Sequence, residues 1–262
     1  MERKLEKSIL IKMYFRSFFI LAVHNYERMQ NLGFLFIIAP VLKKLFPDKL
    51  LRTEAYLRHL EFFNVHPYLV TLPAGKVAAL EEEKVDGKTI SSMKLTMGGP
   101  IAAVGDSLFW ATWRPFCSFF ILCIMFLTGA VNISDNNLVL KGSLSDLSLM
   151  IYPVMFLILY NVPGLLVRYW GLKSGYGKDE GLVELMKKVT MSNVVQYFQS
   201  AGHVLTSCIA VIIFITMDMS FMNKLLLLSS LFSFALLVIR GIPVLVLFYG
   251  LMFAIPVLYF LK

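Results

Sequence analysis

Asn64, His66 and Asp106 are the residues of this sequence whose types and surroundings could do chemistry. Asn64 and His66 come just before Pro67, which disfavours helical geometry at the preceding residue. Residues two positions apart do not share a helix face, so irregular backbone is needed to present both side chains together. Two interpretations stay open. The pair binds a neutral polar ligand, such as the hydroxyls of a sugar, or it caps a helix and satisfies free backbone groups.

Asp106 is a single carboxylate within Met97–Trp113, a stretch of glycine, apolar and aromatic residues. An ionised carboxylate in such surroundings is costly unless something pairs with it. Three roles stay open for Asp106: an acceptor for sugar hydroxyls, an ion or proton site, or a partner for backbone amides released near Gly105 and Pro100.

Two apolar segments, Phe62–Leu80 and Met93–Trp113, are interrupted by glycine and proline and are joined by the charged linker Glu81–Lys94. The residues expected to shape their backbone are Pro67 in the first segment and Gly98, Gly99, Pro100 and Gly105 in the second. Non-helical backbone at membrane depth is tolerated only where it is buried in protein or lines a cavity. The pattern therefore predicts a pair of re-entrant hairpin segments beside a transport path.

The composition is that of a membrane protein. Of 262 residues, 58% are hydrophobic and only 16% are charged, and the mean hydropathy is +0.71. A soluble domain carries about a quarter charged residues. The net charge of +8 is concentrated in the N-terminal third and in one internal loop, as in cytoplasmic segments of membrane proteins, so we expect no nucleic-acid partner. The sequence predicts an all-α polytopic protein.

The predicted organisation has three parts. Residues 1–61 form N-terminal amphipathic or interfacial helices with a partner-contact region, residues 62–115 form the re-entrant hairpin region of the path, and residues 116–262 form a transmembrane helical bundle. About five spans are expected: Phe116–Ile133, Ser148–Val167, Val194–Thr216, Lys224–Ile239 and Ile242–Leu261. Basic residues place the N-terminus and the loop Arg168–Lys188 in the cytoplasm.

Signatures of soluble enzymes are missing. The sequence has no GxxxxGK[ST], HExxH or GxSxG motif, and its four histidines are scattered. The acidic run Glu81–Glu83 precedes further charges, which favours a solvated loop over a catalytic cluster. We therefore expect no catalytic residue, no metal and no cofactor on this chain.

Several motifs occur in a characteristic order. NYERMQNLGFLFIIAPVLKKLFPDKLLRTEAYLRHLEFFNVHPYL is followed by AALEEE and then by MGGPIAAVGDSLFW. Together they resemble the IID membrane subunit of mannose-class sugar phosphotransferase systems, the mannose/fructose/sorbose family. The resemblance is dense over roughly residues 14–115. Val65 departs from it, standing where the family usually has threonine, and Ala103 stands where glycine is usual.

The resemblance implies a subunit of a bacterial inner-membrane permease. In that family IID pairs with the integral subunit IIC in a trimer of IIC–IID pairs, and the sugar is phosphorylated by a phosphohistidine on soluble IIB, itself charged through IIA. The resemblance places Asn64, His66 and Asp106 along the sugar path. It also implies that Glu61 orients His59 or contributes to the docking surface for IIB.

Two alternatives stay open beside the IID interpretation. One is a non-transporting membrane scaffold or regulatory relative that keeps the fold and the partner surface. The other is an independent secondary transporter that is driven by protons through Asp106.

Overall fold

The computed structural model describes residues 5–134, 137–140, 147–177 and 221–240, with separate residues between 196 and 214. Helices dominate this part of the chain. The elements are α1 (Lys7–Arg16), η1 (Ser17–Phe19), α2 (Asn31–Leu45), α3 (Lys49–His59), α4 (Thr71–Glu82), α5 (Gly87–Gly105), η2 (Asp106–Trp113), α6 (Arg114–Leu127), β1 (Val131–Ser134), β2 (Asn137–Leu140), α7 (Leu147–Tyr176) and α10 (Phe221–Ile239).

The chain divides into two compact units. The first contains residues 1–130 and 142–207, and the second contains residues 131–141 and 208–262. Strands β1 and β2 form a short antiparallel hairpin in which Val131 lies opposite Leu140. This hairpin departs from the all-helical prediction, although the described part of the chain is otherwise helical. The predicted boundaries at residues 61 and 115 stay predictions.

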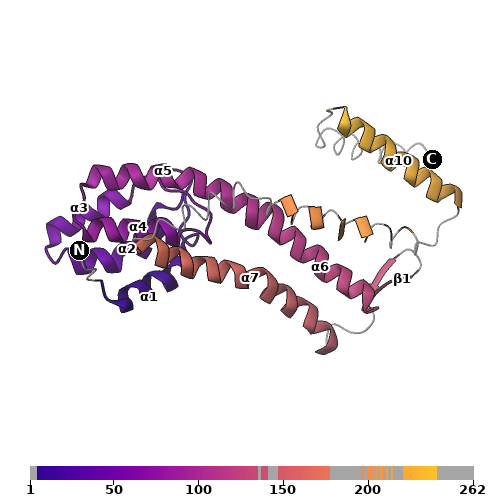
Figure 1. Cartoon of the computed structure of the whole chain (residues 1–262), viewed down its shortest axis with the longest axis horizontal. Coiled ribbons are helices and arrows are strands. Elements are labelled where there is room, and N and C mark those ends of the chain that lie inside the picture. Colours follow the sequence, from indigo (N-terminus) through magenta and orange to yellow (C-terminus); the bar gives the residue numbers. More distant parts are fainter. Residues whose placement is uncertain are drawn as a thin grey trace. The chain divides into compact units, whose positions relative to one another are not determined.

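Segments α5, η2 and α6 follow one another without a break and form one long helix, which can be followed in Figure 1. The predicted turn within Met93–Trp113 is therefore wrong, because α5 continues through Gly98, Gly99 and Pro100. Helix-breaking residues of this kind are tolerated in long apolar helices when tertiary packing re-satisfies the backbone. The segment η2 is π-helical, and Pro115 follows it at the start of α6. Pro115 has no N–H for the carbonyl four residues earlier, so regular α-helical bonding is already interrupted there.

The first predicted segment, Phe62–Leu80, has irregular backbone only in its first half. Residues 62–70 contain turns and a single bridge, and α4 begins at Thr71. Pro73 lies in the first turn of α4, where proline is tolerated because that turn has no N–H partners. Almost every residue of α4 is buried. This helix is central to the packing of the first unit.

Helices α4 and α7 pack closely because small residues face each other. A Cβ atom added at Gly75 would lie 2.8 Å from the Leu172 carbonyl oxygen, and one added at Gly171 would lie 2.6 Å from the Thr71 hydroxyl. The Thr71 hydroxyl donates a hydrogen bond to the Arg168 carbonyl oxygen at 2.8 Å. Small residues allow helix backbones to approach in this way within membranes.

Arg168 lies inside α7 and is buried, so the prediction that it begins a cytoplasmic loop is wrong. Its guanidinium group donates to the carbonyl and hydroxyl oxygens of Ser17 at 2.8 and 3.0 Å. It also lies over the rings of Phe18 and Tyr68, with its Cζ atom 4.8 and 5.4 Å from the ring centroids. These contacts hold α7 against the N-terminal segment and provide partners for the buried guanidinium charge.

Two described helices are long and apolar enough to cross a membrane: Gly87–Leu127, which joins α5, η2 and α6, and Leu149–Tyr176 within α7. Residues 116–127 of the predicted span Phe116–Ile133 are therefore the end of a much longer helix, whereas Val131–Ile133 belong to β1. The predicted span Ser148–Val167 lies within α7, and Lys224–Ile239 lies within α10. The remaining two predicted spans fall mostly or wholly outside the described residues.

Candidate functional site

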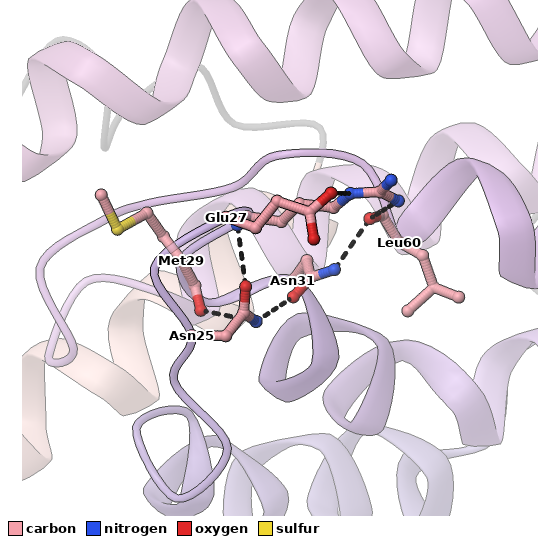
Figure 2. Close-up of polar contacts among 6 residues, drawn as sticks. Asn25, Glu27, Met29, Asn31 and Leu60 are labelled. Atoms are coloured by element: carbon pink, nitrogen blue, oxygen red, sulfur yellow. Dashed lines mark hydrogen bonds and ion pairs between the residues drawn. The ribbon is translucent and has the colours of Figure 1, made fainter.

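The segment that contains Asn64 and His66 is held in place by the polar residues that follow η1. The Asn25 side chain donates to the Asn31 side-chain oxygen at 2.8 Å and accepts from the Arg28 backbone N–H at 2.8 Å. Asn31 in turn donates to the Leu60 carbonyl oxygen at 2.8 Å. Figure 2 shows this chain of hydrogen bonds, which runs from Asn25 through Asn31 to Leu60. The network fixes the path of the backbone just before residues 62–66.

Gln30 extends this attachment to Val65. Its backbone N–H donates to the Phe63 carbonyl oxygen at 2.8 Å, and Met29 forms a parallel bridge with Phe63. Its side-chain amide donates to the Val65 carbonyl oxygen at 2.8 Å and accepts from the Val65 N–H at 3.2 Å. Gln30 thus satisfies both backbone groups of a buried residue in a segment without regular structure. No sequence pattern singles out Gln30, although it lies in the NYERMQN motif.

His66 packs against the long helix at Gly105. A Cβ atom at Gly105 would overlap the Cβ and Cγ atoms of His66, so only glycine fits this approach. The imidazole stacks on Phe109, with ring centroids 5.2 Å apart and planes 18° apart. Tyr68 and Trp110 lie edge-on to the same ring, with centroids at 5.2 and 4.9 Å. The π-helical segment supplies Phe109 and Trp110 to this aromatic enclosure.

The His66 side chain, only 1% exposed, is neutral at physiological pH. Burial, with a smaller contribution from the positive charge of Arg168, lowers the pKa of His66 from 6.5 to about 4. The Tyr68 N–H donates to Nδ1 at 3.3 Å, which assigns the remaining proton to Nε2. Nε2 has no hydrogen-bond partner among the described residues. A buried donor without a partner costs about 1–3 kcal/mol, and a ligand oxygen would recover part of that free energy.

Asn64 borders a cavity of about 210 Å³, which α5 bounds on another side. The lining residues are Phe62, Phe63, Asn64, Lys94, Leu95, Gly98, Gly99 and Ala102. A Cβ atom at Gly98 would lie 3.1 Å from the Asn64 carbonyl oxygen, so Gly98 also marks a close approach. This volume is below the usual range for drug-sized ligands.

Asp106 follows Gly105 but is exposed on the surface of the chain. The structure therefore brings Asn64, His66, Gly98 and Gly105 together and leaves Asp106 outside this contact. Pro67 is buried, whereas Pro100 is exposed. The functional roles predicted for all of these residues stay predictions.

A second polar cluster joins α3 to α4 and corrects two expectations. Glu81 is buried rather than part of a solvated loop, and it accepts two hydrogen bonds from Arg58 at 2.8 and 2.7 Å. His59, which is 1% exposed, contacts the same carboxylate through Nε2 at 2.9 Å. Glu81 thus contacts His59, in place of the predicted Glu61. Glu61 is partly exposed and lies 3.8 Å from Lys94.

The charges of this cluster follow from its burial. Desolvation lowers the pKa of His59 despite the neighbouring Glu81, so the pair is a hydrogen bond from a neutral imidazole. Burial works to raise the pKa of Glu81, but the hydrogen bonds from His59 and Arg58 outweigh it and hold the pKa below its usual value. The carboxylate is therefore paired with the Arg58 guanidinium group in a bidentate contact.

Lys94 connects the cluster to the cavity. Its side chain is buried, and its ammonium group donates to the Arg58 carbonyl oxygen at 3.0 Å and lies 5.7 Å from the centroid of the Phe34 ring. The sequence placed Lys94 at the end of a charged linker, but that linker is only residues 83–86 and Lys94 belongs to α5. Among the described residues no group of three or more His, Cys, Asp or Glu side chains is arranged to hold a metal ion.

Comparisons with known proteins agree with the motif resemblance. Residues 4–134 match the family described as the PTS system mannose/fructose/sorbose family IID component. The fructose permease IID component of Bacillus subtilis (strain 168) is 39% identical over 188 residues, which cover 70% of this chain and 61% of that protein. The PTS system mannose-specific EIID component of Escherichia coli (strain K12) is 35% identical over 191 residues, which cover 71% of this chain and 60% of that protein.

A solved structure also matches nearly the whole chain. In the cryo-EM structure of the mannose transporter ManYZ with microcin E492, the matched chain is 26% identical and superposes with a TM-score of 0.57. The match covers 99% of this chain and 97% of that chain. The chain described here spans about 60% of the length of the two curated relatives in the alignments.

Proposed function

Because this chain belongs to the mannose/fructose/sorbose family of phosphotransferase-system IID components, we propose that it is the IID subunit of a sugar permease. With a IIC partner it translocates a hexose or related sugar across the bacterial inner membrane. Phosphorylation by the phosphohistidine of IIB, recharged through IIA, couples the transport to phosphoenolpyruvate. The family match does not favour an ion-coupled transporter or a non-transporting scaffold.

The observation that carries this proposal is the joint placement of Asn64 and His66 against the long helix. Asn64 borders a cavity of about 210 Å³, and His66 has a buried Nε2–H without a partner in the described part of the chain. Neutral amide and imidazole groups are suited to sugar hydroxyls, which both donate and accept hydrogen bonds. The phosphoryl chemistry is left to the soluble partner.

Asp106 has a different place in the proposal. It lies within a candidate membrane span and is exposed on this chain. A carboxylate facing lipid is costly, so such residues face a water-filled path or another protein. We assign Asp106 to the sugar path where the IID subunit meets IIC, in a trimer of IIC–IID pairs with the N-terminus in the cytoplasm.

The glycine and proline residues support this arrangement in a way that differs from the sequence prediction. Because Gly98 and Gly105 have no Cβ atom, the Asn64–His66 segment can pack closely against the surface of the helix. Pro67 sets the irregular backbone that presents both side chains. Gly99 and Pro100 are exposed on α5, and we assign them to the outer surface that faces the path.

Sugar uptake in cells tests the proposal directly. We expect Asn64→Ala, His66→Ala and Asp106→Asn each to lower phosphoenolpyruvate-dependent uptake by roughly tenfold or more, since one lost polar contact to a ligand has about that effect. Asn161→Ala is the matched control, because within the described part of the chain the Asn161 side chain bonds to the Leu157 carbonyl oxygen of its own helix and to no other group. Undiminished uptake in the three variants, at equal protein levels, would overturn the site assignment. Failure of the unmutated chain to copurify with a IIC subunit would overturn the proposed assembly.

A further inference from the structure

An open apolar groove lies between α1 and α7, away from the Asn64–His66 site, and has a volume of about 980 Å³. Leu10 and Tyr14 of α1 line one side, and Leu172 and Tyr176 of α7 line the other. Two of the three lining tyrosines have engaged hydroxyls, since Tyr14 donates to the Leu165 carbonyl oxygen at 3.4 Å and Tyr176 donates to a Glu82 carboxylate oxygen at 2.7 Å, while the third, Tyr169, is exposed. The walls therefore present hydrocarbon and aromatic rings. The volume lies at the upper end of the range for ligand pockets.

Two cations border this apolar space. Lys7 and Lys173 both line the groove and are exposed, and among the described residues no acidic side chain lines it. Glu6, the acid next to Lys7, pairs with Lys44 instead at 3.0 Å. The groove thus combines positive charge at its edge with an apolar interior, which is complementary to a molecule with an anionic head and a hydrocarbon tail.

The position of the groove along α7 matches the boundary of a bilayer. Lys173 lies in the last turn of α7, at the end of a candidate membrane span. Tyr169 and Trp170 are 56% and 55% exposed one turn earlier, where aromatic belts occur at the membrane–water interface. Ile11 and Phe15 of α1 line the groove and are also exposed, as on a helix that lies in the interface.

We propose that this groove is a binding site for one anionic phospholipid of the bilayer. Lys7 and Lys173 bind the phosphate group, and an acyl chain lies along the apolar walls between α1 and α7. A free phosphate ion would not contact the apolar walls. A zwitterionic phospholipid would place its own positive charge near the two lysines, which would repel it.

Lipid titration of the full chain in detergent tests the proposal. Dioleoyl phosphatidylglycerol or dioleoyl phosphatidylcholine is added to the micelles, and the apparent Kd is obtained from the rise in melting temperature. We expect saturable stabilisation by phosphatidylglycerol only. The double variant Lys7→Gln/Lys173→Gln should weaken it roughly thirtyfold, while Lys43→Gln/Lys49→Gln removes the same charge from other exposed positions and should leave it unchanged.

A second pair of variants tests the apolar part. Ile11→Asp places a carboxylate in the groove at an exposed position, whereas Leu21→Asp makes the same change at an exposed position outside the groove. We expect only Ile11→Asp to abolish the effect of phosphatidylglycerol. Equal effects of the two lipids, equal weakening in both lysine variants, or unchanged binding in Ile11→Asp would overturn the proposal. Dissociation of a complex of two copies by Ile11→Asp, without any lipid effect, would overturn it too by making the groove a protein interface.

Discussion

Two histidines of this protein are equally buried, and their environments differ in the partner that each one finds. His59 meets the Glu81 carboxylate, which two hydrogen bonds from Arg58 also neutralise. His66 meets aromatic rings, and its Nε2–H has no partner in the described part of the chain. Neither imidazole is charged in the folded protein, because burial lowers both pKa values. The first environment is organised around an internal charge pair, whereas the second contains a buried hydrogen-bond donor without a partner among the described residues.

The two environments illustrate two uses of buried polar groups: one group stabilises the fold, and the other remains available to bind a ligand. A polar network in which every charge has a partner stabilises the packing of the helices that contribute to it. A buried donor without a partner destabilises the unliganded protein, and this cost is reduced when a ligand binds. Substitutions in the Glu81 cluster should therefore act mainly on stability, and substitutions around His66 should act on transport as well.

The largest expected effect is the loss of the Glu81 carboxylate. Glu81→Ala should lower the free energy of unfolding by about 3–5 kcal/mol, because it leaves the Arg58 charge and the His59 N–H without their partner. Glu83→Ala is the matched control in the same acidic run, since Glu83 is exposed, and it should have little effect. The melting temperature of the detergent-solubilised protein measures both. A Glu81→Ala protein as stable as Glu83→Ala would contradict the internal charge pair.

The next effect concerns the close approach at Gly105. Gly105→Ala should cost about 1–3 kcal/mol, because its methyl group overlaps the His66 side chain and must displace it. Gly99→Ala places a methyl group at a helical position with no neighbour within 4 Å and should be neutral or stabilising. Melting temperatures and sugar uptake are measured for both variants. If both behave alike, Gly105 has no special contact with His66.

Acid should destabilise the protein partly through His66. The folded-state pKa of about 4 lies below the unfolded value of 6.5, so the folded protein binds fewer protons between these values. Stability is therefore full above pH 6.5 and falls as the pH drops towards 4, by about 2 kcal/mol at about pH 5. His66→Gln should lose correspondingly less stability between about pH 7.5 and about pH 5. The melting temperature of each protein is measured at both pH values. Equal losses of stability in the two proteins would show that the pKa of His66 does not differ between the folded and unfolded states.

A further effect on stability is expected at Gln30. Gln30→Met keeps the size of the side chain but removes its hydrogen bonds to both backbone groups of Val65, which should cost about 1–3 kcal/mol including the unsatisfied groups. Sugar uptake should fall further than this modest loss of stability explains, because Asn64 and His66 flank Val65. Uptake that stays normal in Gln30→Met would show that the segment needs no such attachment.

Sequence patterns locate the two segments that meet at the candidate site but predict the wrong geometry for one of them. Gly98 and Gly105 were expected to turn the backbone, because glycine and proline in an apolar stretch favour irregular structure. The same glycines remain within a continuous helix and instead make room for Asn64 and His66. The sequence cannot distinguish these two uses, since absence of a Cβ atom is required by both.

The buried charges show a second limit of sequence reasoning. Glu81 lies in an acidic run that favours a solvated loop, and Arg168 follows an apolar run as a loop residue would. Both are buried because partners distant in the sequence meet them: Arg58 and His59 for Glu81, and Ser17 for Arg168. Local charge patterns predict exposure only when no such partner exists.

The helical membrane character, the family and the segments that carry the candidate site follow from the sequence alone. Composition and ordered motifs are properties of the chain that do not depend on how distant parts meet. Tertiary packing is needed to show that Gly98 and Gly105 face the Asn64–His66 segment, that Gln30 supports Val65 and that Glu81 neutralises Arg58. These contacts join residues far apart in the sequence, and their free energies depend on distances and burial that appear only when the helices pack.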